Sequence, residues 1–244
     1  MKRTKFLVVL GALVCAPAFA AGGGPLPYSF EPDHGNLPSI QRGARNYMAY
    51  CAGCHSMKHL RYGRIGQDLG IPEDLLRANL MFTSDKPGEP IRSAMPQDAS
   101  NWFGQYPPDL SVETRTRGPS WVYSYLLSFY VDTSRPLGVN NLVLAGASMP
   151  HVLWELQGWQ ALSTAPVGED GHGGDQPRFE QLTEGSLSPA EYEKFVADTV
   201  NFMAYAAEPG KAGRIALGVK VMLYLLLLTV LAYFLKKEYW KDVR

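Results

Sequence analysis

Residues 51–55 of this 244-residue chain read Cys-Ala-Gly-Cys-His, which places two thiols and an imidazole within about one helical turn. Thiols three positions apart can each bond one vinyl group of the same porphyrin, and the adjacent imidazole of His55 can ligate the iron. The pattern predicts one haem c, covalently attached through Cys51 and Cys54. Haem held in this way cannot dissociate.

Two other uses of a Cys-x-x-Cys pair are a zinc site and a redox-active disulfide. The remaining cysteine is Cys15, so a zinc site with four thiolate ligands is excluded. A thioredoxin-like pair normally lies in a βαβ pattern, which the sequence around residues 51–55 does not have. Haem attachment is therefore favoured over both.

A haem that carries electrons needs a second axial ligand, and methionines and histidines elsewhere in the chain are candidates. Met149 lies in an apolar, small-residue stretch at 142–150, and Pro150 fixes the backbone beside its sulfur. Met95 also precedes a proline, but its neighbours are polar. The histidine candidates are His34, His59, His151 and His172. The residues alone favour Met149 and leave the others open.

The first 20 residues have the layout of a secretory signal, with a basic start, an apolar run at 6–14 and a small-residue cleavage site at 18–20. The apolar run is too short for an uncleaved anchor that spans a bilayer. The residues before Cys15 also lack the small residue that a lipoprotein site needs. We expect residues 1–20 to be a signal peptide and the haem domain to be exported.

A second hydrophobic segment covers the 20 residues 215–234 and is interrupted only by Lys220. At ~1.5 Å per residue a helix of this length spans ~30 Å, the thickness of a hydrocarbon core. Lys220 lies near the edge of the segment, where its ammonium can reach the interface. Four basic residues among the last ten predict a cytoplasmic C-terminus. We therefore expect a transmembrane helix at 212–236 and a cytoplasmic tail at 237–244.

Residues 21–211 are expected to form the exported haem domain, an all-α fold of the c-type cytochrome kind with irregular loops around the haem. Apolar spacing predicts a first helix that begins at Ser39 and ends at the haem motif. A further helix is predicted from Pro119 to about Val131. The last helix begins with a capping box at 188–191.

The segments between these helices lack a strong period. Residues 21–38 are rich in Gly and Pro and predict an extended arm. Residues 57–100 show only short helical signals, including a proline at a helix start at 72–76, and otherwise predict irregular surface around the haem. Residues 168–176 predict a mobile acidic loop. The acidic residues of the last helix are expected on its outer, solvent-facing side: Glu191, Glu193 and Asp198.

Four stretches carry a family resemblance: Arg42-Gly43 leading into the haem motif, Pro-Pro-Asp-Leu-Ser at 107–111 followed by Arg115 and Arg117, Ala-Ser-Met-Pro at 147–150, and Ala-Ala-Glu-Pro at 206–209. Together they resemble the cytochrome c1 family, the haem subunits of quinol:cytochrome c reductases. The haem motif is shared by all c-type cytochromes, whereas the second and fourth stretches are typical of this family.

The resemblance implies that Met149 is the sixth ligand and that Pro107 and Pro108 line the haem edge. It implies that Arg115 or Arg117 lies near the haem propionates, without deciding between them. The chain departs from many family members because it lacks the arginine-containing run before residue 107. The stretch between the haem motif and Met149 is also shorter than in mitochondrial relatives.

For function, the resemblance implies a respiratory electron carrier in the bacterial inner membrane, with its haem domain on the periplasmic side. The expected partners are cytochrome b, a Rieske iron-sulfur protein and a cytochrome c. The iron-sulfur protein would donate electrons to this haem, and the cytochrome c would accept them. We expect no bond-making catalysis in this chain and no nucleic-acid partner.

Two rival functions remain. A membrane-anchored haem enzyme with an open distal side would need an acid or base such as His151 or Arg115 over the iron. A cytochrome subunit of a terminal oxidase would differ in its partners rather than in its chemistry. Binding of carbon monoxide to the reduced haem discriminates the first rival, because an iron with two protein ligands does not bind it readily.

Overall fold

The structure is a computed structural model that describes residues 26–163 and 178–242. The predicted signal peptide at 1–20 lies outside these residues, and so does the predicted acidic loop at 168–176. Their predictions therefore stay predictions.

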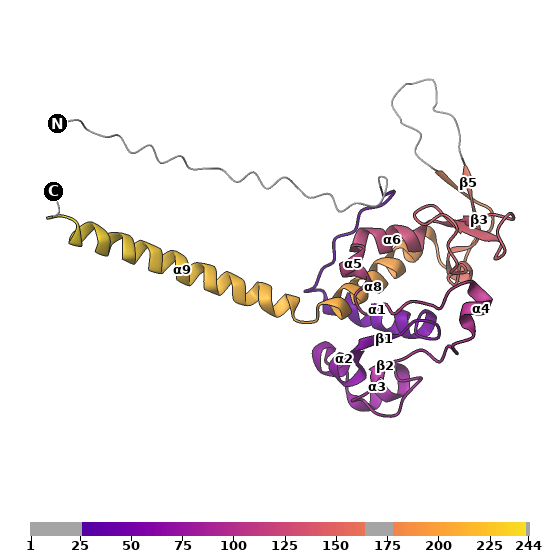
Figure 1. Ribbon diagram of the computed structural model, residues 1–244, viewed down its shortest axis with the longest axis horizontal. Coiled ribbons are helices and arrows are strands. Elements are labelled where there is room, and N and C mark those ends of the chain that lie inside the picture. The colour runs from indigo at the N-terminus through magenta and orange to yellow at the C-terminus, as the bar shows by residue number, and fades with distance from the viewer. Residues whose placement is uncertain (1–25, 164–177, 243–244) are drawn as a thin grey trace, which may run out of the picture.

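The described residues form a helix-rich domain with small sheets, from which one long helix projects (Figure 1). The helices are α1 (Leu37–Tyr50), α2 (Tyr62–Leu69), α3 (Glu73–Asn79), α4 (Ala99–Phe103), α5 (Glu113–Thr116), α6 (Pro119–Leu127), α7 (Trp154–Gln157), α8 (Pro189–Ala207) and α9 (Lys211–Tyr239). The strands form antiparallel pairs: β1 (Met57–Arg61) with β2 (Pro90–Ile91), β3 (Phe129–Val131) with β4 (Val139–Asn141), and β5 (Gln160–Ser163) with β6 (Arg178–Gln181). The predicted all-α class is thus correct for the main packing elements and wrong for these pairs.

Helices α1 and α8 cross at the centre of the domain, beside α5 and α6 (Figure 1). Gly43 permits this close crossing, because a Cβ built there would lie 1.9 Å from the backbone oxygen of Asp198. Beside the crossing, the guanidinium of Arg42 donates to both carboxylate oxygens of Asp198, at 2.6 and 2.9 Å, and the hydroxyl of Ser39 donates to the same carboxylate at 2.6 Å. The two helices are therefore joined by packing and by a buried carboxylate.

The expectation that Asp198 faces solvent is wrong, because this side chain is buried against α1. A buried carboxylate needs a charged or hydrogen-bonding partner, and the partners come from a helix more than 150 positions earlier in the chain. Glu191 and Glu193 are exposed, as predicted.

The predicted helix ends agree with the structure in part. The capping box of α8 is present, with Ser188 as N-cap and its hydroxyl and Glu191 bonded reciprocally. Helix α1 begins at Leu37 instead of Ser39, because the side chain of Asn36 accepts a hydrogen bond from the Ser39 amide at 3.2 Å and acts as the N-cap. Helix α6 ends at Leu127, before the predicted Val131, because the next residues pair as strand β3 with β4.

The prediction of irregular surface for residues 57–100 is wrong for much of the segment. It contains β1, α2, α3 and β2, and several of its side chains belong to the hydrophobic core: Met57, Leu60, Tyr62, Ile65, Leu69, Leu76 and Ile91. These elements are too short to produce a readable period in the sequence.

The extended arm before α1 lies along α6. The amide of Tyr28 donates to the hydroxyl of Ser124 at 3.3 Å, and that hydroxyl donates to the Tyr28 carbonyl at 2.9 Å. Phe30 and Ser120 make the same pair of hydrogen bonds, at 3.0 and 3.1 Å. The ring of Phe30 stacks on Tyr123 with centroids 4.9 Å apart. The described part of the arm is therefore extended, as predicted, and is fixed to the domain.

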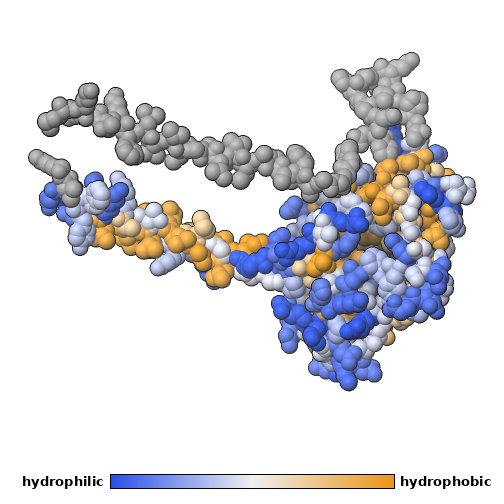
Figure 2. Space-filling view, in the orientation of Figure 1, coloured by the Kyte–Doolittle hydropathy of each residue, from blue (hydrophilic) through white to orange (hydrophobic). Residues whose placement is uncertain are grey.

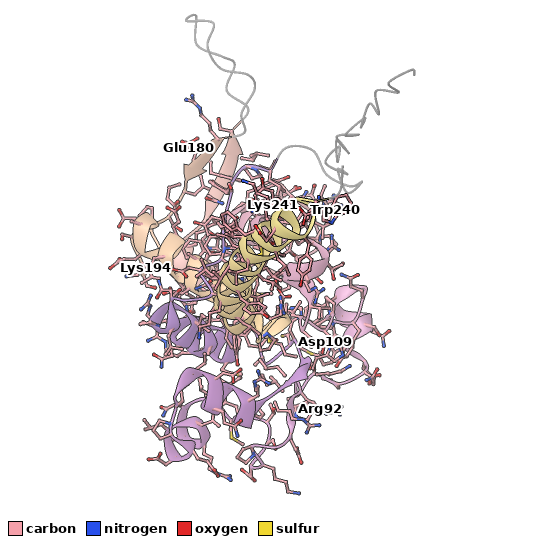
Figure 3. The ribbon with its side chains drawn as sticks, turned by 90° about the vertical axis from the view of Figure 1, so that its left-hand side faces the viewer. Arg92, Asp109, Glu180, Lys194, Trp240 and Lys241 are labelled. Carbon is pink, nitrogen blue, oxygen red and sulfur yellow. The ribbon has the colours of Figure 1, made fainter. Side chains whose placement is uncertain are left out.

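Helix α9 has the length and composition of a membrane span. Its mean hydropathy over the most apolar window is 2.4, and none of that window is buried against the rest of the described chain. Figure 2 shows apolar side chains along its middle and hydrophilic ones at both ends. Trp240 and Lys241 lie at its far end, which faces the viewer in Figure 3. The expected transmembrane segment at 212–236 falls inside this helix.

Candidate haem site

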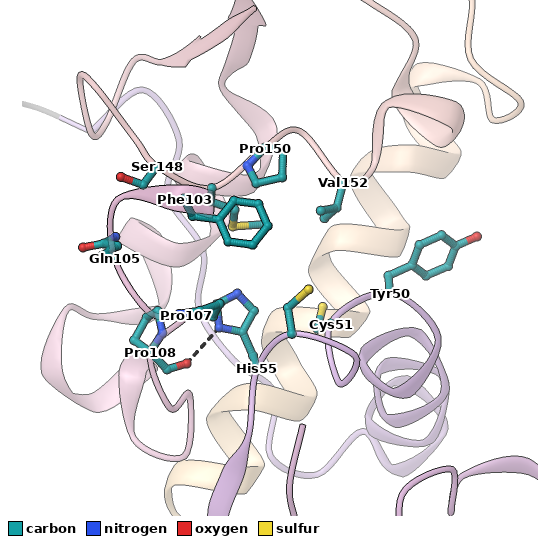
Figure 4. A pocket seen from close by; sticks show the side chains of 12 residues that line it. Tyr50, Cys51, His55, Phe103, Gln105, Pro107, Pro108, Ser148, Pro150 and Val152 are labelled. Carbon is teal, nitrogen blue, oxygen red and sulfur yellow. Dashed lines mark hydrogen bonds between the residues drawn. The ribbon is translucent and has the colours of Figure 1, made fainter. Parts of the chain in front are cut away.

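A pocket between α1, the segment at 103–108 and the segment at 148–152 brings together most of the predicted site residues (Figure 4). It is lined mainly by apolar groups, with the two thiols and one imidazole among them. The lining residues are Tyr50, Cys51, Cys54, His55, Phe103, Gln105, Pro107, Pro108, Ser148, Met149, Pro150 and Val152.

The end of α1 presents the two thiols. Cys51 is the C-cap, and its amide donates to the carbonyl of Tyr47 at 2.8 Å. The chain then turns back, with the amides of Cys54 and His55 donating to the Cys51 carbonyl at 3.1 and 2.8 Å. The haem motif therefore continues the helix as one tight turn, which is the arrangement that the sequence predicts.

Cys51 and Cys54 are not joined to each other by a disulfide. Burial raises the pKa of Cys51 to about 12, with a further contribution from Cys54, and burial also raises the pKa of Cys54. Redox-active and nucleophilic cysteines have the opposite property, a lowered pKa that stabilises the thiolate. The electrostatics of the pair therefore argue against a thioredoxin-like role.

His55 is oriented by its own hydrogen bond. Its Nδ1 lies 2.8 Å from the carbonyl oxygen of Pro108, as the dashed line in Figure 4 shows. A carbonyl oxygen only accepts hydrogen bonds, so Nδ1 carries the proton and Nε2 keeps a free lone pair. Burial lowers the pKa of His55, which favours the neutral ring. This is the tautomer that a metal ligand needs.

The segment 107–111 is fixed in place by Asp109. Its carboxylate accepts hydrogen bonds from the backbone amides of Lys58 and Ser111, both at 2.9 Å. Burial alone would raise the pKa of Asp109, but these hydrogen bonds outweigh it and lower the pKa. The anchored turn fixes the carbonyl of Pro108, and through it the ring of His55.

The opposite wall carries Met149. Figure 4 shows Ser148 and Pro150 across the pocket from His55 and Cys51, and Met149 lies between them in the chain and lines the same pocket. The thioether, the imidazole and both thiols therefore share one pocket, although nearly 100 residues separate Met149 from the haem motif.

The alternative ligands within the described residues do not line this pocket: Met95, His34, His59 and His151. His172 lies outside the described residues. The ring of His151 is buried and stacks on Phe129 with centroids 5.1 Å apart and planes 6° apart. Burial lowers the pKa of His151 to about 4, so the ring is neutral at neutral pH.

Neither predicted propionate-binding arginine lines the pocket. Arg117 pairs with Glu113 at 2.7 Å, and its guanidinium lies 4.3 Å from the ring centroid of Trp121. Arg115 lines a different pocket, near the start of α9, with His34 and Lys211. Their role at the propionates stays a prediction.

Several lining residues were not predicted, among them Tyr50, Phe103, Gln105 and Val152. Phe103 gave a signal that could have been used, because it forms an aromatic pair with Trp102 in an otherwise polar stretch. Gln105 and Val152 gave none, since only the fold brings their segments to the haem motif.

The donor set suits an iron porphyrin. Within the described part of the chain, no group of three or more His, Cys, Asp or Glu side chains is placed to hold a metal ion. A metal that brings its own four porphyrin nitrogens needs only axial ligands, and thiols in a mainly apolar pocket suit a porphyrin with vinyl groups. The residues present therefore fit a covalently held haem.

Comparison with known proteins agrees with this chemistry. The model of the Cytochrome C1 family matches residues 31–158 and 175–243. The cytochrome c1 of Allochromatium vinosum is 48% identical over 240 residues, covering 97% of this chain and 98% of that protein. The ammonia monooxygenase gamma subunit of Nitrosomonas europaea is 42% identical over 246 residues, covering 100% of each.

More distant matches include the cytochrome c1 of Rhodospirillum rubrum, 29% identical over 85% of this chain and 82% of that one. A solved chain of a hyperthermophilic respiratory Complex III is 18% identical, with a TM-score of 0.38 over 90% of this chain and 82% of that one. The family match, the 48% identical relative and the pocket lead to one assignment: the chain belongs to the cytochrome c1 family.

Proposed function

We propose that the chain binds one haem c through thioether bonds to Cys51 and Cys54, with His55 and Met149 as axial ligands. In this proposal it is the one-electron carrier of a quinol:cytochrome c reductase. The observation that carries the proposal is the single pocket that contains both thiols, the oriented imidazole and the thioether.

When bound, the haem supplies reversible one-electron redox chemistry. The chain contributes the environment that sets the potential. The carbonyl of Pro108 holds the proton of His55 at Nδ1 and leaves Nε2 available as a ligand. A thioether at Met149 favours the ferrous state and so raises the potential. Apolar lining residues such as Phe103 and Pro107 limit access of water.

The proposed partners follow from the family. A Rieske iron-sulfur protein would deliver electrons to this haem, a cytochrome c would receive them, and a cytochrome b would complete the membrane complex. No bond is made or broken in this chain during transfer, so its role in the oxidoreductase reaction is to carry electrons.

A haem enzyme with an open distal side is less well supported. Its two candidate acid or base residues are His151, which is stacked on Phe129, and Arg115, which lines another pocket. Within the described residues, neither lies among the groups that line the haem pocket.

The partner assignment can be tested directly. The alternative partner is an ammonia monooxygenase, because the 42% identical relative is named as a subunit of that enzyme. We expect purification of the native complex through a tag on the C-terminus to recover a cytochrome b and an iron-sulfur protein, and quinol to reduce the haem in that complex. Recovery of ammonia monooxygenase subunits without a cytochrome b would contradict the proposal.

The domain limits and the topology are also part of the proposal: a signal peptide at 1–20, a periplasmic haem domain at 21–211, a membrane helix at 212–236 and a cytoplasmic tail at 237–244. The basic C-terminal tail supports this orientation. Protease added to intact spheroplasts should release a soluble haem peptide and leave an epitope tag after Arg244 intact.

Lysed spheroplasts provide the control, because the tag should then be digested. Loss of the tag from intact spheroplasts, with the haem domain protected, would reverse the orientation.

A further inference from the structure

The loop that carries Met149 leaves strand β4 at Asn141 and has no helix or strand of its own before Met149. Its sequence from 145 to 148 is Ala-Gly-Ala-Ser, so it has little side-chain surface of its own to pack. A loop of small residues loses much conformational entropy when it is ordered. Something outside the loop must therefore hold the sulfur in place.

Asn141 makes the main contacts with the start of this loop. Its Oδ1 accepts hydrogen bonds from the amides of Val143 at 2.9 Å and Leu144 at 3.2 Å. Its Nδ2 donates to the carbonyl of Tyr125 in α6 at 2.8 Å. Asn141 is 1% exposed, so its own amide group is shielded from water. Asn141 thus joins the loop to the core helix α6.

Asn140 holds the middle of the loop in the same way. Its Oδ1 accepts from the amide of Gly146 at 2.8 Å, and its Nδ2 donates to the carboxylate of Asp132 at 2.9 Å. Gly146 has φ of +76°, a conformation that favours glycine, so the turn at this point is specific. Two successive asparagines therefore anchor the loop upstream of the ligand.

Downstream of Met149, the imidazole ring of His151 holds the chain against its neighbours. His151 stacks on Phe129 of strand β3, and its other side meets Trp159 edge to face, with centroids 5.8 Å apart. The anchors on both sides of Met149 therefore rest on the β3–β4 hairpin and on α6, both outside the haem pocket.

We propose that Asn141 is a positioning residue for the sixth ligand: its amide holds the methionine loop against α6 and so keeps the thioether of Met149 at the haem. Asn140 assists, and together they form what we call the asparagine clamp. This inference rests on the proposed ligation by Met149. It predicts that loss of the clamp loosens the methionine without loss of the haem.

The test uses full-length holoprotein purified with its haem. In Asn141→Ala the amides of Val143 and Leu144 and the carbonyl of Tyr125 lose a buried partner, and hydrogen bonds of this kind are each worth enough to change an equilibrium several-fold. We expect carbon monoxide to bind the reduced protein at least about tenfold faster than the wild type. The thioether-to-iron charge-transfer band of the ferric protein should weaken, while the pyridine haemochrome spectrum still reports two thioether bonds.

Asn46→Ala is the matched control. Asn46 is 2% exposed and donates to Phe195 and Thr199 of α8, at 3.2 and 3.3 Å, so its loss also removes buried hydrogen bonds. Within the described residues, the side chain of Asn46 makes no hydrogen bond to the methionine loop. We therefore expect the charge-transfer band and slow carbon monoxide binding to persist. Equal weakening of the band in both variants, or an unchanged band in Asn141→Ala, would overturn the proposal.

If Asn141→Ala does not accumulate, Asn140→Ala decides, because it frees the amide of Gly146 and should increase carbon monoxide binding in the same direction by a smaller factor. An unchanged rate in that variant overturns the proposal. Failure of the ligand assignment itself looks different: the band would then persist in Met149→Leu, whatever the clamp variants do.

Discussion

Replacing Met149 by leucine should abolish the thioether-to-iron charge-transfer band and open the reduced iron to carbon monoxide. Leucine is close to methionine in volume and apolar, so the pocket should keep its packing while it loses the sulfur. The haem should stay attached, because Cys51 and Cys54 are untouched. Absorption spectra of the ferric protein and carbon monoxide binding to the ferrous protein measure the two effects.

The histidine variant tests the same site through the potential. Imidazole stabilises ferric iron more than a thioether does, so Met149→His should lower the reduction potential by on the order of a few tenths of a volt. Such a shift would prevent efficient reduction of this haem by an iron-sulfur protein of high potential. Redox titration of the purified holoprotein measures it.

Met95→Leu is the matched control, because Met95 is also followed by a proline but does not line the pocket. It should leave both the band and the potential unchanged. Persistence of the band in Met149→Leu together with its loss in Met95→Leu would exchange the two assignments.

Gly43→Ala should destabilise the domain strongly, because the added methyl group has no room between α1 and α8. The added Cβ would lie 1.9 Å from the backbone oxygen of Asp198 and 2.7 Å from the Cβ of Phe202. Alanine favours a helix over glycine by about 1 kcal/mol, but the clash is with the backbone of the neighbouring helix, which cannot rotate away. Separation of α1 from α8 also disturbs the carboxylate that Arg42 and Ser39 contact.

We expect the variant to lose about 3 kcal/mol of unfolding free energy, the upper part of the range for overpacked cores. Chemical denaturation of the detergent-solubilised holoprotein, followed by circular dichroism, measures the change. The control is Gly88→Ala, where an added Cβ meets nothing within 4 Å and the change should stay within about 0.5 kcal/mol. Equal stability of the two variants would contradict the close crossing.

The local features of the chain could be predicted because they depend on neighbouring residues. The capping box at Ser188 needs only residues within one turn, and it is present. The long apolar segment predicts helix α9 by composition alone. The haem motif lies at the end of α1 as predicted, because the helical period runs directly into it.

The tertiary structure decided what depends on distant residues. Asp198 is a charged residue of the kind usually found at the surface, but it is buried, because Arg42 and Ser39, more than 150 positions earlier in the chain, contact it from α1. The short elements between 57 and 91 join the core although no period marks them. The sequence alone left several candidates for the sixth ligand, and among the described ones only Met149 lines the pocket that holds the haem motif.

The sequence by itself therefore indicated the type of cofactor chemistry and the membrane helix, since each depends on residues that are adjacent in the chain. Only the tertiary structure decided which methionine shares a pocket with His55 and which hydrogen bonds the loop before it makes. Those contacts join α6, the β3–β4 hairpin and the loop to Met149, and the geometry of a loop with small side chains is set by its distant hydrogen-bond partners and not by its own composition.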